Sequence, residues 1–587
     1  MKKLLAPLMG GAAFIAACAA YPAFAQGGVI EDFVPVTQDM LINPDPADWP
    51  MFRRSLNAWN HSPLDQINTE NVANMQLAWV APLEVGTIEM APLVYDGVMY
   101  MLNPGSVIQA MDAATGDLIW EYRRELPEGV SATGALRNIA IYDNKIFHST
   151  PDAYLIALNA QTGQLEWETA VGDYNESFNS SSGPIVVNGM VMSPHTCSRT
   201  GNVVAGGCYI TAHDADSGEE LWRTHTIARP GDEADETWNG SPVDSRFHAS
   251  PWMPGSYDAD LDLLFWGTGV PAPHARVLRP EGDGDLLYTD STLALDPDTG
   301  EIVWYFQYTP NDNWDLDAVF DRFVVETVVN PNPDEVAWIS PNVTPGETRH
   351  VLTGAPDKTG MIYTIDAETG EFLWAREQTY QNIKLDLDLE TGRPVYNEDA
   401  IHTELDQTLL ICPHVGGGRN WPAGSYSPVN NAIFTPLNNT CTEATPYADE
   451  RIPGGGQYRW PAVQVPDGSG DIGRLQAVSA ETGETLWTWE QGPALGGGIM
   501  TTAGDLLFSG DINRRFRAFD ANNGDVLWET ILSGPVSGHP ITYAVDGQQY
   551  VAIAVGGGTL QEGNFGPLTP EVAIRRGSNA VYVFTVN

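Results

Sequence analysis

Two aspartates stand two residues apart, directly behind a tryptophan, in the segment Asn-Trp-Asp-Leu-Asp at residues 313–317. In a β-strand this spacing would point the side chains of Asp315 and Asp317 to the same face. Two carboxylates held together cost free energy unless a proton or a cation lies between them. The pair is therefore a candidate for proton transfer or cation binding. Because the chain has 76 acidic and 29 basic residues, a solvated acidic loop is the alternative interpretation.

A repeated phrase predicts the elements that would position such a site. Each copy has an apolar segment, a turn core and a second apolar segment that ends in tryptophan. The core is of the type Asp-x-x-(Thr/Ser/Asn)-Gly, with Asn159 and Ser479 in the place of aspartate in two copies. The seven copies end at Trp120, Trp167, Trp222, Trp304, Trp374, Trp487 and Trp528. The core indicates a turn, because glycine supplies a positive φ and aspartate bonds to nearby backbone. The apolar segments have the pattern of β-strands.

Several strands per repeat predict radial β-blades rather than a helical solenoid. Seven copies are compatible with seven blades. However, residues 74–83 and 579–587 have the pattern of two parts of one closing blade, whose pairing would remove the free edges of a ring. We therefore predict an all-β fold, an eight-bladed β-propeller formed as a single domain by residues 26–587. The repeat tryptophans are expected to pack between neighbouring blades.

Composition limits the classes of partner. The chain has 587 residues, 43% of them hydrophobic, which is ample for a large core. Its formal net charge of −47 argues against binding to nucleic acid, whose phosphates it would repel, and against docking on anionic lipid. Such a charge suits a protein that stays soluble or meets a cationic partner.

The N-terminus predicts export. In residues 1–25 two lysines precede an apolar run, and Ala-Phe-Ala at 23–25 is a signal-peptide cleavage site that leaves Gln26 as the mature start. The alternative is a lipoprotein box that ends at Cys18. No later run is apolar and long enough to span a membrane, so no membrane insertion is expected.

The cysteines remaining after cleavage predict two disulfides, because four is an even number and the compartment is oxidising. Proximity favours Cys197–Cys208 and Cys412–Cys441, although four cysteines allow three pairings. The chain has no Cys-x-x-Cys-His motif for c-type haem, and the cysteine spacings match no zinc template.

Further ordered motifs extend the pattern, among them DWPMFRRSLNAWN, SYDADLDLLFWGTG, TPNDNWDLD, GGRNWPAGSYSP and YVAIAVGGG. Together with the repeats they resemble the pyrroloquinoline quinone (PQQ) dependent alcohol dehydrogenases, eight-bladed quinoproteins whose blades carry a tryptophan docking phrase. The resemblance covers essentially the whole mature chain. The segments around Trp120 and Trp374 are most similar to sorbose/sorbosone-type and bulky secondary-alcohol members.

The resemblance implies a set of cofactor contacts. PQQ would stack on the ring of Trp252, Lys358 would donate to the ortho-quinone oxygens, and Asp315 would be the catalytic base. The remaining implied cofactor contacts are polar: Glu89, Arg137, Ser181 and Asn420. The planar guanidinium of Arg137 suits a cofactor carboxylate. Structural roles are the alternatives: a core tryptophan, a surface ion pair for Arg137 and a solvated turn for Lys358.

Two metal ligands of the methanol-type members are missing. No acid lies between Ser193 and Tyr209, and Val270 stands where those members have an asparagine. A cation on the quinone oxygen would act as a Lewis acid and would need oxygen ligands. We therefore expect Asp317 to join Asp315 as a replacement ligand. Ca²⁺ is the expected ion and a lanthanide the alternative, because an aspartate at this position marks lanthanide-using members; an ordinary acid is the competing interpretation of Asp317.

A third departure concerns the adjacent-cysteine disulfide that covers PQQ in many members. Ser131 and Ala132 occupy those positions. The Cys197–Cys208 bond is expected to rebuild this neighbourhood by closing a different loop. Small residues at these positions and at Val270 predict a cavity roomier than a methanol enzyme needs.

These features predict a soluble periplasmic oxidoreductase. It would oxidise a hydroxyl of a polyol, sugar or bulky secondary alcohol to a carbonyl by hydride transfer to PQQ, and pass the electrons to an external acceptor such as a soluble cytochrome c. The competing hypothesis is a non-catalytic propeller that scaffolds envelope proteins, since a fold does not fix a function. A scaffold would not need Asp315, Lys358, Arg137 and Trp252 together.

Overall fold

The computed structural model describes residues 26–131, 133–176, 178–197, 207–279, 281–449, 456–466, 468, 470–575 and 578–586. The expected signal peptide lies outside these residues. The described chain is built mainly of strands and turns, with two short α-helices, α1 (Gln38–Ile42) and α2 (Leu560–Phe565). Its 3₁₀ turns are η1 (Val72–Asn74), η2 (Tyr174–Glu176), η3 (Glu233–Trp238), η4 (Val243–Ser245), η5 (Arg276–Leu278), η6 (Glu398–Ala400) and η7 (Gly566–Leu568). Neither α-helix of the described chain is long and apolar enough to cross a membrane.

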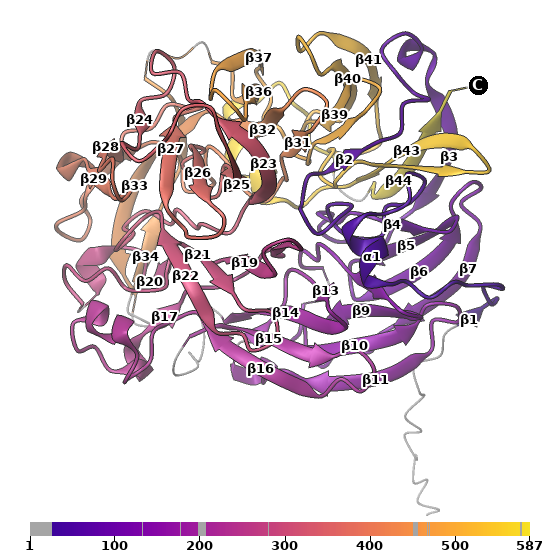
Figure 1. Cartoon of the computed structure of the whole chain (residues 1–587), viewed down its shortest axis with the longest axis horizontal. Helices are drawn as coiled ribbons and strands as arrows, with labels where there is room; N and C mark the ends of the chain where they lie inside the picture. The colour runs from indigo at the N-terminus through magenta and orange to yellow at the C-terminus, as the bar shows by residue number, and fades with distance from the viewer. Residues whose placement is uncertain are drawn as a thin grey trace, which may run out of the picture.

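Eight sheets in the described residues share one pattern, four antiparallel strands that pair with their neighbours. In Figure 1 these sheets follow one another around a ring, and their colour runs from indigo to yellow in chain order. The first four contain β4 (Leu93–Tyr95), β5 (Val98–Asn103), β6 (Val107–Asp112) and β7 (Leu118–Arg123); β8 (Ala140–Tyr142), β9 (Lys145–Ser149), β10 (Tyr154–Asn159) and β11 (Leu165–Ala170); β13 (Ile185–Val187), β14 (Met190–Cys197), β15 (Tyr209–Asp214) and β16 (Glu220–His225); and β18 (Ser256–Asp258), β19 (Leu263–Gly267), β21 (Ser291–Leu295) and β22 (Ile302–Gln307).

The other four sheets complete the ring. They contain β23 (Phe323–Val329), β25 (Glu347–Gly354), β26 (Ile362–Asp366) and β27 (Phe372–Arg376); β31 (Ser425–Ser427), β32 (Ala432–Asn438), β36 (Gly473–Ser479) and β37 (Thr485–Gln491); β38 (Met500–Thr502), β39 (Leu506–Gly510), β40 (Arg515–Asp520) and β41 (Val526–Ile531); and β42 (Ile541–Val545), β43 (Gln548–Val555), β44 (Ala580–Thr585) and β3 (Gln76–Pro82). In the last of these, β44 lies between β43 and β3, so the two segments that the sequence predicted to pair do so.

Shorter strands extend the sheets or form excursions from the ring. Single strands add to sheet edges: β1 (Gln26–Gly27), β2 (His61–Ser62), β12 (Phe178–Asn179) and β24 (Trp338–Ile339). Small separate sheets contain β17 (Phe247–His248) and β20 (Pro271–Ala272); β28 (Lys384–Leu387) and β29 (Pro394–Tyr396); and β30 (Leu409–Ile411), β33 (Thr440–Ala448), β34 (Gly456–Arg459) and β35 (Ala462–Gln464). The strands β33 to β35 leave the ring between β32 and β36.

The repeated phrase forms the turn between the third and fourth strands of a sheet. Between β6 and β7 the Asp112 carboxylate accepts the backbone N–H groups of Ala114 and Thr115, both at 2.9 Å. Gly116 closes the turn with a φ of +77°. This is the turn chemistry that the sequence predicted, with the side chain of aspartate replacing backbone partners.

Six of the seven repeat tryptophans lie against the glycine turn of the following sheet, whereas the Trp528 indole donates to the Met75 carbonyl at 3.2 Å. The Trp120 indole N–H donates to the Ala160 carbonyl at 3.0 Å, and its ring packs so closely on Gly163 that a Cβ there would lie 2.5 Å from it. Ring-to-glycine contacts recur for Trp79 on Gly116, Trp167 on Gly218, Trp222 on Gly300, Trp304 on Gly370, Trp374 on Gly483 and Trp487 on Gly524. These contacts couple neighbouring sheets through buried aromatic area.

The topology separates two faces of the ring. In a four-stranded antiparallel sheet, the connection between strands three and four lies at the opposite end from the connection between strands two and three. The glycine turns therefore occupy one face. The connections between strands two and three, and those entering strand one, meet on the other face, which leaves that face for residues outside the repeated phrase.

Candidate active site

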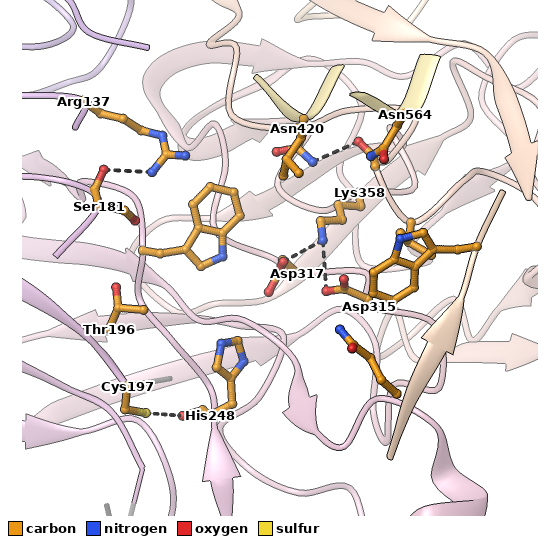
Figure 2. Close-up of a pocket in the computed structure, with 16 residues that line it drawn as sticks. Arg137, Ser181, Thr196, Cys197, His248, Asp315, Asp317, Lys358, Asn420 and Asn564 are labelled. Carbon is orange, nitrogen blue, oxygen red and sulfur yellow. Dashed lines mark hydrogen bonds and ion pairs between the residues drawn. The ribbon is translucent and has the colours of Figure 1, made fainter. Parts of the chain in front are cut away.

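A cavity of about 430 Å³ opens where these connections meet. Its volume is in the range of small-molecule sites. Four of its residues come from connections that enter the first strand of successive sheets: Arg137 before β8, Ser181 before β13, Trp252 before β18 and Asp315 before β23. Figure 2 shows the side chains of Arg137, Ser181 and Asp315 around one space, although these residues are far apart in the sequence.

The carboxylates of Asp315 and Asp317 converge on one ammonium group. Lys358 Nζ lies 3.0 Å from Asp315 Oδ1 and 2.7 Å from Asp317 Oδ2, and all three side chains are buried (Figure 2). Lys358 lies between β25 and β26, and its N–H donates to the Leu316 carbonyl at 3.1 Å, which ties the two loops together. The pair is thus compensated by a cation, as two neighbouring carboxylates require.

The two aspartates lie in a loop. They do not lie in a strand, where their spacing would have pointed both side chains to the same face. Residues 313–317 belong to no strand, and Asp315 has a φ of +70°. Asp312 shapes the loop, because its buried carboxylate accepts the N–H groups of Trp314 and Leu316. Burial raises the pKa of Asp312 to about 7 despite these bonds. The convergence that the sequence suggested is present, but the backbone conformation behind it is different.

Asp317 also contacts the backbone of Val270, the residue that stands where the methanol-type members have an asparagine. Its Oδ1 accepts the Val270 N–H at 3.1 Å, and the Val270 side chain is fully buried. A Cβ on Gly269 would lie 2.4 Å from the same oxygen, so glycine permits this close approach. In the segment between Ser193 and Tyr209, which lacks the acid of the methanol-type members, Thr196 lines the cavity. Neither Val270 nor Thr196 supplies a carboxylate.

Arg137 organises the opposite wall. Its guanidinium donates to Glu89 at 2.6 Å and to the Ser181 carbonyl at 2.8 Å, and lies 5.0 Å from the centroid of the Trp252 ring. The Nε of Arg137 is buried without a hydrogen-bond partner among the described residues. The Trp252 ring is half-buried and packs edge-on against Phe320 at 5.3 Å. Glu89 was also predicted to contact the cofactor. It forms a hydrogen bond with Arg137 but is not among the described residues that line the cavity.

Asn420 lines the cavity in the connection that enters β31. Its amide N–H donates to the Gly416 carbonyl at 2.9 Å, and its Oδ1 accepts the Trp421 N–H at 2.7 Å. Figure 2 shows the Asn420 side chain on the cavity wall. The structure therefore brings Arg137, Ser181, Trp252, Asn420 and the Lys358 cluster to one cavity, as the motifs implied.

The cavity has further walls that sequence reasoning missed. Apolar surface comes from Val415, Trp460 and Leu560, and amide groups come from Gln457 and Asn564. Gln457 and Trp460 belong to the β33–β35 excursion, and Leu560 and Asn564 to α2. These segments lie outside the repeats, so no periodic pattern marked them.

Histidines also surround the cavity. His248 lines it and interacts with the Val270 carbonyl at 2.9 Å. His274 Nδ1 lies 3.8 Å from Asp315 Oδ1, and its ring packs edge-on against Trp460. Neither residue could be assigned from the sequence, because no spaced histidine cluster accompanies them.

Both predicted disulfides are formed, Cys197–Cys208 and Cys412–Cys441. Cys197 lines the cavity, and its sulfur lies 3.6 Å from the His248 carbonyl oxygen. The Cys197–Cys208 bond therefore borders the cavity. Ala132, one of the two residues at the adjacent-cysteine positions, lies outside the described residues.

Comparison with known proteins agrees with this arrangement. The family described as glucose/ethanol/alcohol dehydrogenase, beta-propeller domain (PQQ) matches residues 49–381 and 471–551. Fold and cavity together define a quinoprotein-type β-propeller oxidoreductase. The chain belongs to the PQQ-dependent alcohol dehydrogenase family.

Similar proteins include the dehydrogenase subunit of alcohol dehydrogenase (quinone) from Komagataeibacter europaeus, 33% identical over 89% of this chain and 74% of the relative. Quinoprotein alcohol dehydrogenase PedH from Pseudomonas putida is 32% identical over 85% of this chain and 84% of its own length. Among solved structures, quinohemoprotein alcohol dehydrogenase ADHIIG from Pseudomonas putida HK5 has a TM-score of 0.81 and 29% identity over 94% of this chain and 83% of that one.

Proposed function

We propose that this protein oxidises an alcohol hydroxyl to a carbonyl with PQQ as its cofactor and Asp315 as the base. The observation that carries the proposal is the convergence of Asp315, Lys358, Arg137 and Trp252 on one cavity. Each has a structural alternative when taken alone. A scaffold has no need to bring a buried carboxylate, two cations and an aromatic face to the same space.

The residues present fit the cofactor. PQQ is a flat quinone that carries carboxylates, and the half-buried Trp252 ring offers a face for stacking. Arg137 is oriented by Glu89 and Ser181 and keeps a buried Nε donor without a partner among the described residues, which a cofactor acceptor would satisfy. Asn420 and Ser181 supply further polar groups on the cavity wall.

The side chains of this chain would handle the hydroxyl proton. PQQ, when bound, accepts the hydride from the carbinol carbon. The Asp315 carboxylate would accept the hydroxyl proton as general base. Lys358, 3.0 Å away, compensates the negative charge of the loop and would donate hydrogen bonds toward the quinone oxygens. Burial excludes bulk water from this set and strengthens its electrostatic interactions.

The carboxylate pair also fits a metal ion. Asp315 and Asp317 already converge on one positive charge, that of Lys358, and carboxylate oxygens are the ligands that Ca²⁺ and similar hard cations take. We propose both as metal ligands, with Ca²⁺ as the ion and a lanthanide as the alternative. Since neither Thr196 nor Val270 offers a carboxylate, Asp317 would be the replacement ligand.

Replacing Asp317 with asparagine is expected to weaken Ca²⁺ binding by about ten-fold or more, because one charged oxygen ligand is lost. Titrations of the apo-protein with Ca²⁺ and with La³⁺, both in the presence of PQQ, would measure the affinities. Asp244→Asn, at an exposed position, is the matched control. An unchanged affinity for both ions would remove Asp317 from the ligand set.

The substrate is proposed to be a polyol, a sugar or a bulky secondary alcohol. Val415, Trp460 and Leu560 give the cavity an apolar wall, while Gln457 and Asn564 add amide donors and acceptors. An apolar wall suits the carbon skeleton of a branched alcohol, and amides suit additional hydroxyls. The sequence likeness to sorbose/sorbosone-type and bulky secondary-alcohol members points the same way.

The proposal also covers the blade architecture, the location of the protein and its electron acceptor. The eight four-stranded sheets are taken as the blades of one propeller domain, residues 26–587, with the tryptophan–glycine contacts as docking between blades. Residues 1–25 are proposed to be a cleaved signal peptide and the location periplasmic. The external electron acceptor is proposed to be a soluble cytochrome c; the net charge of −47 favours a basic partner.

A dye-linked assay tests the function directly. The protein is mixed with PQQ and Ca²⁺, and bleaching of an artificial electron acceptor is followed with primary alcohols, secondary alcohols, polyols and sugars. Alcohol-dependent bleaching is expected, strongest with the bulkier substrates. No bleaching with any member of the panel would favour the scaffold.

A further inference from the structure

A second cavity, of about 680 Å³, lies on the face of the ring opposite the candidate active site. Asp258 and Asp260 line it, at the end of β18 and in the turn to β19, the connection between the first two strands of a sheet. In an antiparallel sheet this connection lies at the same end as the one between strands three and four, where the glycine turns are. The two cavities share no lining residue among those described.

Negative charge dominates the polar lining of this cavity. Asp258, Asp260 and Glu326 each bring a carboxylate to it. Its described lining residues include no lysine or arginine, and His350 is the one basic side chain among them. Because Asp258 is 3% exposed, solvent screens its charge poorly. Three carboxylates around one space, faced by a single imidazole, leave negative charge that a cation would compensate.

The imidazole of His350 lies between two carboxylates. His350 of β25 is directly opposite Glu326 of β23 in the register of the sheet. Its Nε2 lies 3.2 Å from Glu326 Oε2, and its Nδ1 lies 3.3 Å from Asp258 Oδ2. A neutral imidazole has one N–H group and can donate to only one of these carboxylates. The other nitrogen faces an oxygen lone pair unless a second proton or a metal ion lies between them.

The positions of the donor atoms fit a metal ion. Asp258 Oδ1 accepts the N–H groups of Asp260 at 2.9 Å and Leu261 at 3.1 Å, which leaves Oδ2 directed at His350. Donor atoms of Asp258, Asp260 and His350 lie within 4.8 Å of one another. Two ligand atoms about 2.1 Å from zinc at a tetrahedral angle are about 3.4 Å apart, and Asp258 Oδ2 and His350 Nδ1 are separated by 3.3 Å. The Nε2–H of His350 would then donate to Glu326, as the outer nitrogen of a metal-bound histidine does to a carboxylate.

We propose that Asp258, Asp260 and His350 form a second metal site, which binds Zn²⁺ with water completing the coordination. One imidazole nitrogen with two carboxylates suits a first-row divalent ion, whereas Ca²⁺ takes oxygen ligands. Asp258 and His350 belong to consecutive sheets, those of β18 and β25, so the ion joins these two sheets. The loop of residues 313–317 joins the same two sheets on the other face. The site is independent of the proposed alcohol oxidation.

Zinc titration of the full chain tests the proposal. The protein is stripped with a chelator, loaded with PQQ and Ca²⁺, freed of excess ions and titrated with Zn²⁺ in a calorimeter. Asp260→Asn and His350→Gln each remove one ligand. Asp298→Asn, at an exposed turn in the same sheet as Asp258, is the matched control. Asp317→Asn shows whether the ion enters the candidate active site instead.

Wild type is expected to bind one equivalent of Zn²⁺, and Zn²⁺ should raise its thermal unfolding midpoint because the ion binds the folded chain. Asp260→Asn and His350→Gln are expected to raise the Kd by about ten-fold or more, a loss of about 1.4 kcal/mol in binding free energy. Asp298→Asn and Asp317→Asn should keep the wild-type Kd. Co²⁺ used in place of Zn²⁺ should give visible absorption bands that His350→Gln loses.

A wild-type chain that binds no Zn²⁺ would overturn the proposal, as would equal affinities in His350→Gln and Asp298→Asn. Zinc binding that is lost in Asp317→Asn but kept in His350→Gln would place the ion in the candidate active site and also overturn it. Asp260 is exposed, so Asp260→Asn should fold even if His350→Gln does not, and either folded variant decides. Calorimetry reads binding directly, so a failure to oxidise alcohols would leave the result unaffected.

Discussion

Replacing Asp315 with asparagine is expected to lower kcat for alcohol oxidation by about 10²- to 10⁴-fold, the usual contribution of a general base. The amide keeps the shape of the side chain but cannot take up the hydroxyl proton. Lys358 would retain Asp317 as its ionic partner at 2.7 Å, so the loop should keep its place. Steady-state rates with the best alcohol of the panel give the measurement.

A structural collapse must be separated from the loss of a base. Asp315→Asn should still hold PQQ through gel filtration, because Arg137 and Trp252 lie on the opposite wall. Asp546→Asn makes the same chemical change at an exposed turn and should leave kcat unaltered. A kcat near the wild-type value in Asp315→Asn would assign the proton transfer to another group.

Replacing Lys358 with methionine is expected to reduce the free energy of unfolding by about 3–5 kcal/mol. The change removes the cation from between two buried carboxylates, which then repel each other without solvent to screen them. Urea unfolding of the apo-protein at neutral pH provides the measurement.

Lys384→Met is the matched control, because Lys384 forms a fully buried ion pair with Asp357 at 2.5 Å and does not line the cavity. It should also destabilise the protein, since one buried carboxylate loses its partner. Added Ca²⁺ is expected to restore stability to Lys358→Met only, because two carboxylates converge there. A Ca²⁺ effect of equal size in both variants, or in neither, would contradict a cation site between Asp315 and Asp317.

The fold was predictable where a local rule repeats. A glycine turn followed by a tryptophan can be recognised in each copy of the phrase alone, and the contact of Trp120 with Gly163 recurs for every other repeat tryptophan except Trp528. The pairing of β3 with β44 was predictable for a related reason. Each segment has the pattern of a strand but lies at one end of the repeats, without a full set of partner strands beside it in the sequence. Both inferences rest on backbone sterics and strand pattern, which depend little on distant context.

The candidate site was predictable only in part, because its residues lie in connections without a repeat. Asp315 and Asp317 were singled out by their spacing, yet the reason was incomplete: their carboxylates meet through a loop held by Asp312. Trp460 and Leu560 belong to an excursion and a short helix that reach the cavity from afar. Such contacts are set by tertiary packing, and nothing local to those residues indicates them.

The place of β44 in its sheet has a consequence for how the protein is made. This strand lies between β3, near the start of the described chain, and β43. As the chain emerges, the preceding sheets can form before the final strand is available, but β3 cannot pair with β44 until about five hundred further residues have emerged. The sheet that contains β3 can therefore be completed only when this six-residue strand is available to pair with both neighbours. A chain halted shortly before residue 580 would display both of them as templates for pairing with other chains.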